Sequence, residues 1–175
     1  MLQLGEDRRR LRFVLGQHGI AAGAGFSPSF LCVVLFRLSH YLFVNGHTIT
    51  ARLVWQLNLF ATGADLSPMC RVGEGLVVMH PVGAIILGCA GRGLTVEGHG
   101  GLGGGMALDD IGAGPGLPVL GDDVRLARGA SILGPVRIGD RVLVGPGCTV
   151  VRDLPADTEV SAHEVRLRRT GSVAI

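Results

Sequence analysis

An aliphatic residue opens every unit of six in the stretch from Leu120 to Pro155. These residues are Leu120, Leu126, Ile132, Ile138, Val144 and Val150. The fifth place of each unit is small or apolar, and it holds Val124, Ala130, Val136, Val142, Cys148 and Leu154. A period of six is typical of a parallel β-helix, in which each unit supplies one short strand with its turn and the stacked coils bury the aliphatic positions. Strands of a sandwich or barrel are the alternative, but their turns recur roughly every eight to twelve residues.

Two helices are predicted before this array. The Ser27-Pro28 pair is typical of a helix start, and apolar residues recur at spacings of three and four from Phe30 to Val44. Asn45-Gly46 ends this helix, and a second helix is predicted from Thr48 to Phe60. Because apolar residues cover most of the helix surface, we expect the pair to cap one end of the β-helix or to form a subunit interface.

The first coils are predicted to begin near Leu66, where units of six run to Gly83. The phase then slips, and residues 84–97 show at most one imperfect coil. Residues 98–118 are too rich in glycine for a strand and are predicted to form a long loop of the kind that often carries function. We therefore divide the chain into an N-terminal helical segment (1–60, loosely organised to residue 27), a β-helix domain (61–157) and a C-terminal tail (158–175).

Composition excludes some classes of function. The 175 residues carry a net charge of +2 with 17% charged residues, which argues against a nucleic-acid-binding surface. The N-terminus lacks the order of a signal peptide, and the uncharged run at 19–36 is a weak membrane candidate. The four arginines between positions 8 and 12 are expected to be solvated. The four cysteines form no C-x-x-C pair and the histidines have no ligand spacing, so we expect reduced thiols, a cytoplasmic protein and no metal.

The order of these segments resembles a known family. A helix pair, the segment GADLSPMCRVGEGLVVMH, a glycine-rich loop and the hexads from Leu117 onward are similar to the serine acetyltransferases of the hexapeptide-repeat acyltransferase superfamily. The resemblance covers roughly residues 28–157. It implies a mainly β fold, a left-handed parallel β-helix with a short N-terminal helical segment, usually assembled as a homotrimer. It also implies that acyl-CoA lies in a groove between neighbouring subunits.

The resemblance assigns catalytic and donor-binding residues. His80 matches the general base that removes the proton of the acceptor hydroxyl, and Asp65 matches the aspartate that orients this base. On the donor side, the residues that match are Gly103, Gly104, Arg128, Gly129, Ala130 and Pro146. Arg128 or Arg152 is a candidate partner for a CoA phosphate.

The acceptor side departs from the family pattern. Met79 replaces an aspartate before the base, and residues 115–118, Pro-Gly-Leu-Pro, replace an Asp-Arg-His-Pro segment that holds the substrate carboxylate. A buried charge without a partner is costly, so free serine is expected to bind poorly. Residues that we expect at a more apolar acceptor site are Met79, Leu102 and Leu117, with Asp109 and Asp110 as candidates for meeting a cationic acceptor.

Two further residues are candidates for chemistry. His99 lies in the glycine-rich loop and is a candidate replacement for the missing second histidine, and Cys89 is a weaker candidate nucleophile. We expect an acyltransferase that uses acetyl-CoA, another acyl-CoA or the phosphopantetheine arm of an acyl carrier protein, and a small hydroxyl or amine acceptor. The alternatives are a catalytically silent trimeric scaffold and a module that binds a small acyl or nucleotide ligand.

Overall fold

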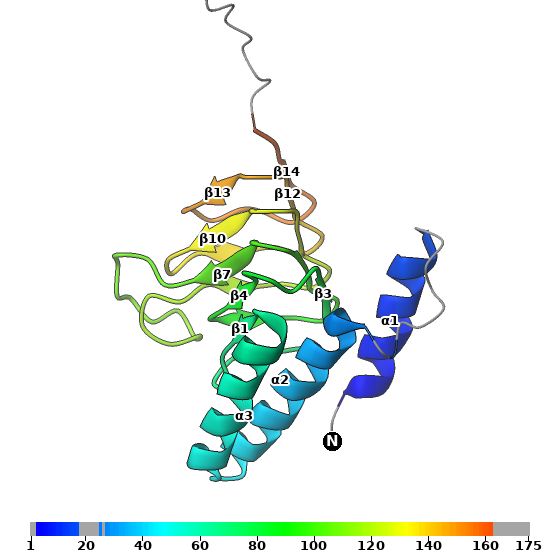
Figure 1. Ribbon diagram of the computed structural model, residues 1–175. Coiled ribbons are helices and arrows are strands. Elements are labelled where there is room, and N and C mark those ends of the chain that lie inside the picture. The colour runs from blue at the N-terminus through cyan, green and yellow to red at the C-terminus, as the bar shows by residue number, and fades with distance from the viewer. Residues whose placement is uncertain (1–2, 18–24, 26, 163–175) are drawn as a thin grey trace, which may run out of the picture.

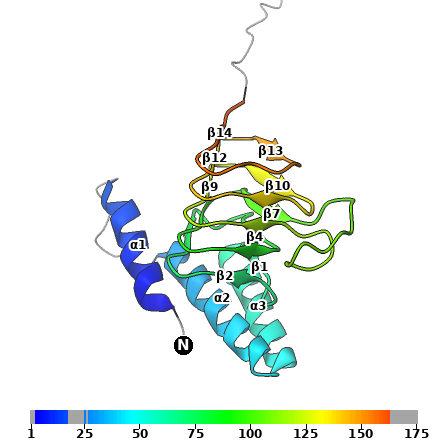
Figure 2. The ribbon, with the colours of Figure 1, turned by 180° about the vertical axis from the view of Figure 1, so that it is seen from behind.

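The computed structural model describes residues 3–17, 25 and 27–162, in which three helices precede a β-solenoid (Figure 1). The helices are α1 (Leu4–Gln17), α2 (Pro28–Val44) and α3 (Thr48–Thr62). Helices α2 and α3 form a hairpin beneath the first coil, at the end of the solenoid opposite β14 (Glu159–Val160), and α1 lies beside the first coils (Figures 1 and 2).

Three parallel sheets form the sides of the solenoid. The first, sheet A, contains β1 (Asp65–Leu66), β4 (Ile85–Ile86), β7 (Gly101–Gly103), β10 (Ser131–Leu133) and β13 (Thr149–Val150). Sheet B contains β2 (Arg71–Val72), β5 (Cys89–Ala90), β8 (Val119–Leu120) and β11 (Arg137–Ile138). Sheet C contains β3 (Val77–Met79), β6 (Thr95–Glu97), β9 (Arg125–Leu126), β12 (Leu143–Val144) and β14. The prediction of a parallel β-helix is confirmed.

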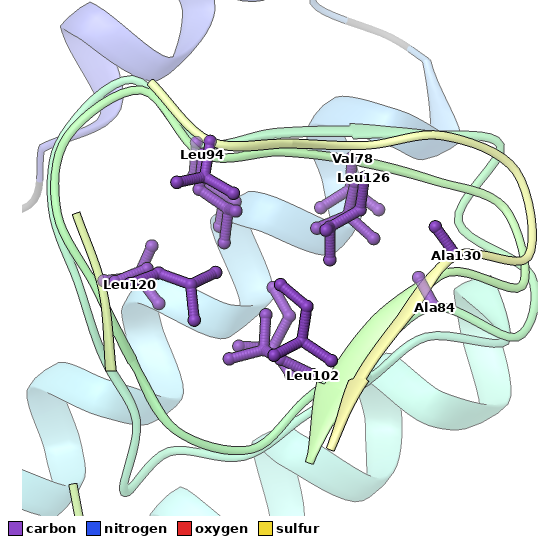
Figure 3. Close-up of a cluster of buried hydrophobic side chains, with 14 of the residues drawn as sticks. Val78, Ala84, Leu94, Leu102, Leu120, Leu126 and Ala130 are labelled. Carbon is purple, nitrogen blue, oxygen red and sulfur yellow. The ribbon is translucent and has the colours of Figure 1, made fainter. Parts of the chain in front are cut away.

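The hexad positions form the core of the solenoid. All six aliphatic residues that open the units between 120 and 150 are buried, as are the fifth-place residues Val124, Ala130, Val136, Val142 and Cys148. The coils stack these side chains in layers that point into the interior, as Leu120 and Leu126 do in Figure 3. Cys70 and Cys148 are buried in this core, where they pack as small hydrophobic residues.

Three boundaries differ from the sequence prediction. Residues 84–97 form a full coil, with β4, β5 and β6 on the three successive sides of the solenoid, and β14 continues the repeat to Val160. The glycine-rich stretch contains strand β7, which pairs with β4 and β10. The prediction that this stretch cannot be a strand was wrong because the neighbouring coil requires glycine there: a Cβ on Gly101 would meet the carbonyl oxygen of Ile85.

The helical hairpin follows the prediction closely. The side chain of Ser27 caps α2 by accepting a hydrogen bond from the Phe30 N–H at 3.2 Å, and Pro28 occupies the first turn. Helix α3 ends at Gly63, whose φ of 74° is the left-handed conformation that favours glycine at a helix C-terminus. Within the described residues, none of the helices combines the length and apolar character needed to cross a bilayer.

Helix α1 contradicts the prediction of a loosely organised N-terminus. Leu11 and Leu15 are buried against Val77 of β3, and Asp7 is completely buried. The Asp7 carboxylate forms an ion pair with Arg37 of α2 at 2.9 Å. Arg10, expected to be solvated, instead donates to the carbonyl oxygen of Gly75 at 2.7 Å. Polar contacts to distant segments therefore hold this helix in place. The predicted tail from residue 163 onward lies outside the described residues.

Candidate active site

A groove of about 260 Å³ follows the outer face of sheet A, next to the corner that joins sheets C and A. Its lining is formed by Gly83, Ile85, Leu87, His99, residues 100–104, Ser131 and Leu133. The alternate residues of these strands, such as Ile86 and Leu102, are buried in the core, which leaves the intervening residues facing outward. The groove is therefore a shallow, mostly apolar channel lined in part by glycines, which carry no side chain.

His80 begins an enlarged corner beside this groove. Five residues, 80–84, connect Met79 to Ile85, whereas the matching corner of the next coil uses only three, 98–100. His80 is exposed and has a φ of 52°, a left-handed conformation that is uncommon outside glycine. Gly98 lies directly over His80, because a Cβ on Gly98 would stand 2.6 Å from the His80 carbonyl oxygen. The extra residues thus present the imidazole at the surface of the first coil.

Asp65 is the first residue of β1, at the start of the stacked positions of sheet A that include Ile85. It pairs with Ile85, which in turn pairs with Gly101 of the groove. One carboxylate oxygen, Oδ1, accepts a hydrogen bond from the Trp55 indole N–H at 2.8 Å. Within the described residues, no hydrogen bond or ion pair joins Asp65 to His80. The expected pair therefore occupies neighbouring segments of one coil, and helix α3 fixes the orientation of the carboxylate.

The residues predicted to hold the donor occupy two parts of the site. Gly103 and Gly104 line the groove, and nothing but the end of Leu133 lies within 4 Å of a Cβ built on Gly103. Arg128, Gly129 and Pro146 stack on the corner above His80, with Gly129 donating its N–H to the Gly98 carbonyl at 3.2 Å. Of these donor-site candidates, Gly103 and Gly104 line the groove itself, whereas the corner residues lie outside its lining.

Ala130 and Leu102 point away from this channel. Both side chains are buried in the solenoid core, so Leu102 and Ala130 can offer a ligand chiefly their backbone atoms. Met79 packs against the cluster of Leu11, Leu15 and Val77 beneath helix α1. Its side chain therefore contributes to holding α1, which leaves the apolar acceptor wall to other residues.

Leu117 and Gly116 belong to the segment that is expected, from the resemblance, to replace a histidine and an arginine. Leu117 Cδ2 lies 3.7 Å from the position of a Cβ on Gly104, so its isobutyl group borders the glycine pair. Gly116 is buried with a φ of 71°, and a Cβ there would stand 2.6 Å from the carbonyl oxygen of Ala107. The backbone at this position therefore has no room for an arginine side chain.

The glycine-rich loop between β7 and β8 projects from the solenoid on the side away from α1 (Figures 1 and 2). Arg71 and Arg137 of sheet B donate to the carbonyl oxygens of Gly112 and Ile111, the second at 2.9 Å. Asp110 accepts the N–H groups of Gly112 and Gly114, and these hydrogen bonds lower the pKa of its carboxyl group. The Asp110 carboxylate therefore stabilises the turn of the loop to which it belongs.

The remaining predicted residues lie in different parts of the structure. Asp109 is exposed on the loop, and Arg152 follows β13 on an exposed turn. Cys89 lies on β5 of sheet B, with its sulfur 4.0 Å from the Gly112 carbonyl oxygen, and so it faces the loop on a different side of the solenoid from the groove. His99, by contrast, lines the groove directly. Among the described residues, no group of three metal-ligating side chains comes together.

Sequence reasoning missed Trp55. Trp55 falls within the predicted second helix, and nothing in its spacing distinguishes it from the other apolar residues there. Only the packing of α3 beneath the first coil brings its indole N–H to Asp65.

Comparison with known proteins places this geometry among transferases. Residues 118–152 match the family model described as bacterial transferase hexapeptide (six repeats). The serine acetyltransferase of Synechococcus elongatus is 31% identical over 135 residues, which cover 76% of this chain and 54% of that protein. The serine acetyltransferase of Helicobacter pylori is 32% identical over 132 residues, covering 73% of this chain and 74% of that one. The chain thus spans about half the length of the first of these relatives and about three quarters of the second.

Solved structures agree with the sequence comparison. The soybean serine acetyltransferase complexed with serine has a TM-score of 0.80 and 26% identity, over 91% of this chain and 66% of that one. The serine acetyltransferase of Neisseria gonorrhoeae also has a TM-score of 0.80, at 24% identity, over 91% of this chain and 64% of that one. The helical hairpin and the solenoid therefore share one fold with these proteins.

Proposed function

The chain belongs to the serine acetyltransferase family, and we propose that it is an acyltransferase that moves an acetyl or related acyl group from a CoA or phosphopantetheine thioester to a hydroxyl or amine acceptor. The observation that carries this proposal is the groove on sheet A. Its lining glycines carry no side chain and so leave room for a thin pantetheine arm, and the corner that presents His80 adjoins it.

In this reaction His80 acts as the general base. Its exposed imidazole removes the proton from the acceptor O–H or N–H as the oxygen or nitrogen attacks the thioester carbonyl. The carbon–sulfur bond then breaks, and the thiol product carries away a proton. Asp65 orients the base and stabilises the imidazolium that forms, and the Trp55 N–H holds Asp65 Oδ1 in place for that task.

Free serine is not the proposed acceptor. A zwitterion needs a cationic partner for its carboxylate, yet Gly116 excludes an arginine side chain and Leu117 places an apolar group beside Gly104. Asp110 is held by backbone N–H groups and so is a poor partner for an ammonium group. We infer that the acceptor is a less charged hydroxyl or amine that tolerates an apolar wall.

Arg128 is the proposed contact for the donor's phosphates. It stands exposed on the corner one coil above Gly98 and forms no ion pair within the described residues. A guanidinium there is free to pair with a phosphate group at the end of the pantetheine arm. Since the sheet A face is open to solvent in one protomer, the proposed assembly is a homotrimer in which a neighbouring copy covers the groove.

The test is release of CoA thiol from acetyl-CoA in the presence of a panel of hydroxyl and amine acceptors that includes free serine. His80→Ala is expected to lower kcat by about 10² to 10⁴-fold while CoA affinity, measured by calorimetry, stays unchanged. His47→Ala is the matched control, because His47 is an exposed histidine at the tip of the helical hairpin whose side chain makes no capping hydrogen bond.

A catalytically silent trimeric scaffold is the second candidate. It is favoured by one observation, which is that no hydrogen bond or ion pair joins Asp65 to His80 in the described residues of the protomer. Wild-type and His80→Ala proteins that release thiol equally would decide for the scaffold. Absence of CoA binding alone leaves two choices, a carrier-protein donor or the scaffold. Efficient acetylation of serine would instead contradict the proposed change of acceptor.

A further inference from the structure

His99 occupies a turn position that is glycine in the coils around it. In the stack, His99 lies over Gly83 and under Gly129, which in turn lies under Gly147. All four residues have a left-handed backbone, with φ values of 71° at Gly83, 60° at His99, 69° at Gly129 and 67° at Gly147. An imidazole therefore stands in this column where the other coils have no side chain.

The turn itself explains why glycine is preferred there. Gly100 donates to the Glu97 carbonyl at 2.8 Å, and Ala130 donates to the Ala127 carbonyl at 2.9 Å, so each coil turns through the same four-residue hydrogen-bonded turn. The third residue of this turn has positive φ, which L-residues with a side chain adopt reluctantly. A histidine kept in a strained position beside a groove is the kind of outlier that indicates a function.

The imidazole uses space that Gly83 leaves open. A Cβ on Gly83 would stand 2.5 Å from His99 Nδ1, so the ring lies directly over the bare backbone of the coil below. His99 and Ser131 are the polar side chains among the groove's lining residues, and His99 is the one imidazole among them. His80 belongs to the corner immediately beneath, because Gly98 lies over it.

We propose that His99 is a second catalytic histidine, which donates a proton to the thiolate that leaves the thioester. This inference rests on the proposed acyl transfer. His80 takes the proton of the acceptor, the new bond to the acyl carbon forms and the carbon–sulfur bond breaks. The imidazolium of His99 then protonates the departing sulfur. The two imidazoles afterwards return to their starting states by exchanging protons with solvent.

Two histidines with opposite roles require a bell-shaped dependence of rate on pH, since one must be neutral and the other protonated. Three charged or titratable groups lie on the segments packed against His99. They are His80 on the coil below, Arg128 on the coil above and Glu97 on the strand that precedes His99. Loss of the acidic partner removes the alkaline limb of this profile and leaves the acid limb.

The variant His99→Gly tests the inference, because it restores the residue that the neighbouring coils use. We expect a melting temperature equal to or above that of the wild type, unchanged CoA affinity and a fall in kcat of about 10² to 10⁴-fold. Arg141→Gly is the control: Arg141 also has a left-handed φ, 56°, but lies on the turn before β12, on another corner of the solenoid. This control is expected to keep full activity.

A second measurement separates proton donation from a structural role. An aryl thioester, whose thiolate leaves without protonation, is expected to restore the activity of His99→Gly toward that of the wild type. Gly83→Ala provides an independent check, because its methyl group displaces the ring while His99 remains, and it should lower kcat in the same way. Its melting temperature is measured in parallel.

The outcomes are distinguishable. Wild-type rates in His99→Gly, an unchanged pH profile, or no recovery with the aryl thioester each overturn the role of His99 while leaving the acyl transfer of His80 in place. A wild-type protein that releases no thiol with any acceptor overturns the proposed function, and the role of His99 fails with it.

Discussion

The buried ion pair between Asp7 and Arg37 makes a sharp prediction about stability. Arg37 Nε and one terminal nitrogen donate to the two Asp7 carboxylate oxygens at 2.9 and 3.0 Å. Arg37 also donates to the carbonyl oxygens of Val72 and Gly73, both at 2.6 Å, and Asp7 accepts the N–H of Leu76 at 2.8 Å. Every hydrogen bond of this network joins α1 or α2 to another segment of the chain.

The variant Asp7→Asn removes the negative charge and keeps the size of the side chain. The guanidinium then remains buried, at 4% exposure, without a countercharge. Removing one partner of a buried pair costs about 3–5 kcal/mol, far more than an exposed pair contributes. With an unfolding entropy of about 2.1 cal/mol/K per residue, a chain of 175 residues loses about 8–14 °C in melting temperature.

Thermal unfolding followed by circular dichroism measures this change. Glu6→Gln is the matched control, because Glu6 is the neighbouring residue on α1 and pairs at the surface with Arg9, whose side chain is 79% exposed. The control is expected to shift the melting temperature by no more than about 2 °C. If Asp7→Asn unfolded within about 2 °C of the wild type, the ion pair would not fasten α1 to the solenoid.

Three further predictions follow from the same contacts. Trp55→Phe removes the hydrogen-bond donor to Asp65, and we expect kcat for acyl transfer to fall by about tenfold with unchanged CoA affinity; unchanged kcat would show that the donor does not matter. Gly101→Ala places a methyl group against the Ile85 carbonyl oxygen of the coil below, and it should lower the free energy of unfolding by denaturant by about 1–3 kcal/mol. An unchanged free energy would contradict that close approach. Burial raises the pKa of the Cys70 thiol to about 11, so a thiol reagent at pH 8 should label the half-exposed Cys89 first in the native protein, and a Cys89→Ser variant that still reacted rapidly would refute this order.

The repeat could be predicted because its signal is local. Each hexad contains its own inward residue and its own turn, so residues 120–154 reveal the solenoid without any knowledge of distant contacts. The helical hairpin is equally local, with Ser27 as its N-cap and Asn45-Gly46 as its turn. The candidate base and its partner were found through resemblance, and the structure brings both to one coil beside the groove.

The errors concern segments whose structure depends on distant residues. Helix α1 is held by Arg37, which lies 30 residues beyond Asp7 in the chain. Strand β7 needs glycine at position 101 because the coil below approaches within 2.3 Å of where a Cβ would lie. The link between Trp55 and Asp65 depends on the angle at which α3 meets the first coil. A single sequence does not encode such contacts in its periodicity.

The two ends of the solenoid differ, and this difference limits how copies can associate. Helices α2 and α3 close the end at the first coil, while the last coil, with β13 and β14, presents exposed charged residues at its turns. These residues are Arg152, Asp153, Asp157 and Glu159. Charged side chains on a terminal strand discourage edge-to-edge pairing, which would otherwise lengthen a parallel stack into a fibre. Growth along the axis is therefore opposed at the helical end and at the charged last described coil, so the proposed trimer would form through the sides of the solenoid, one of which carries the groove.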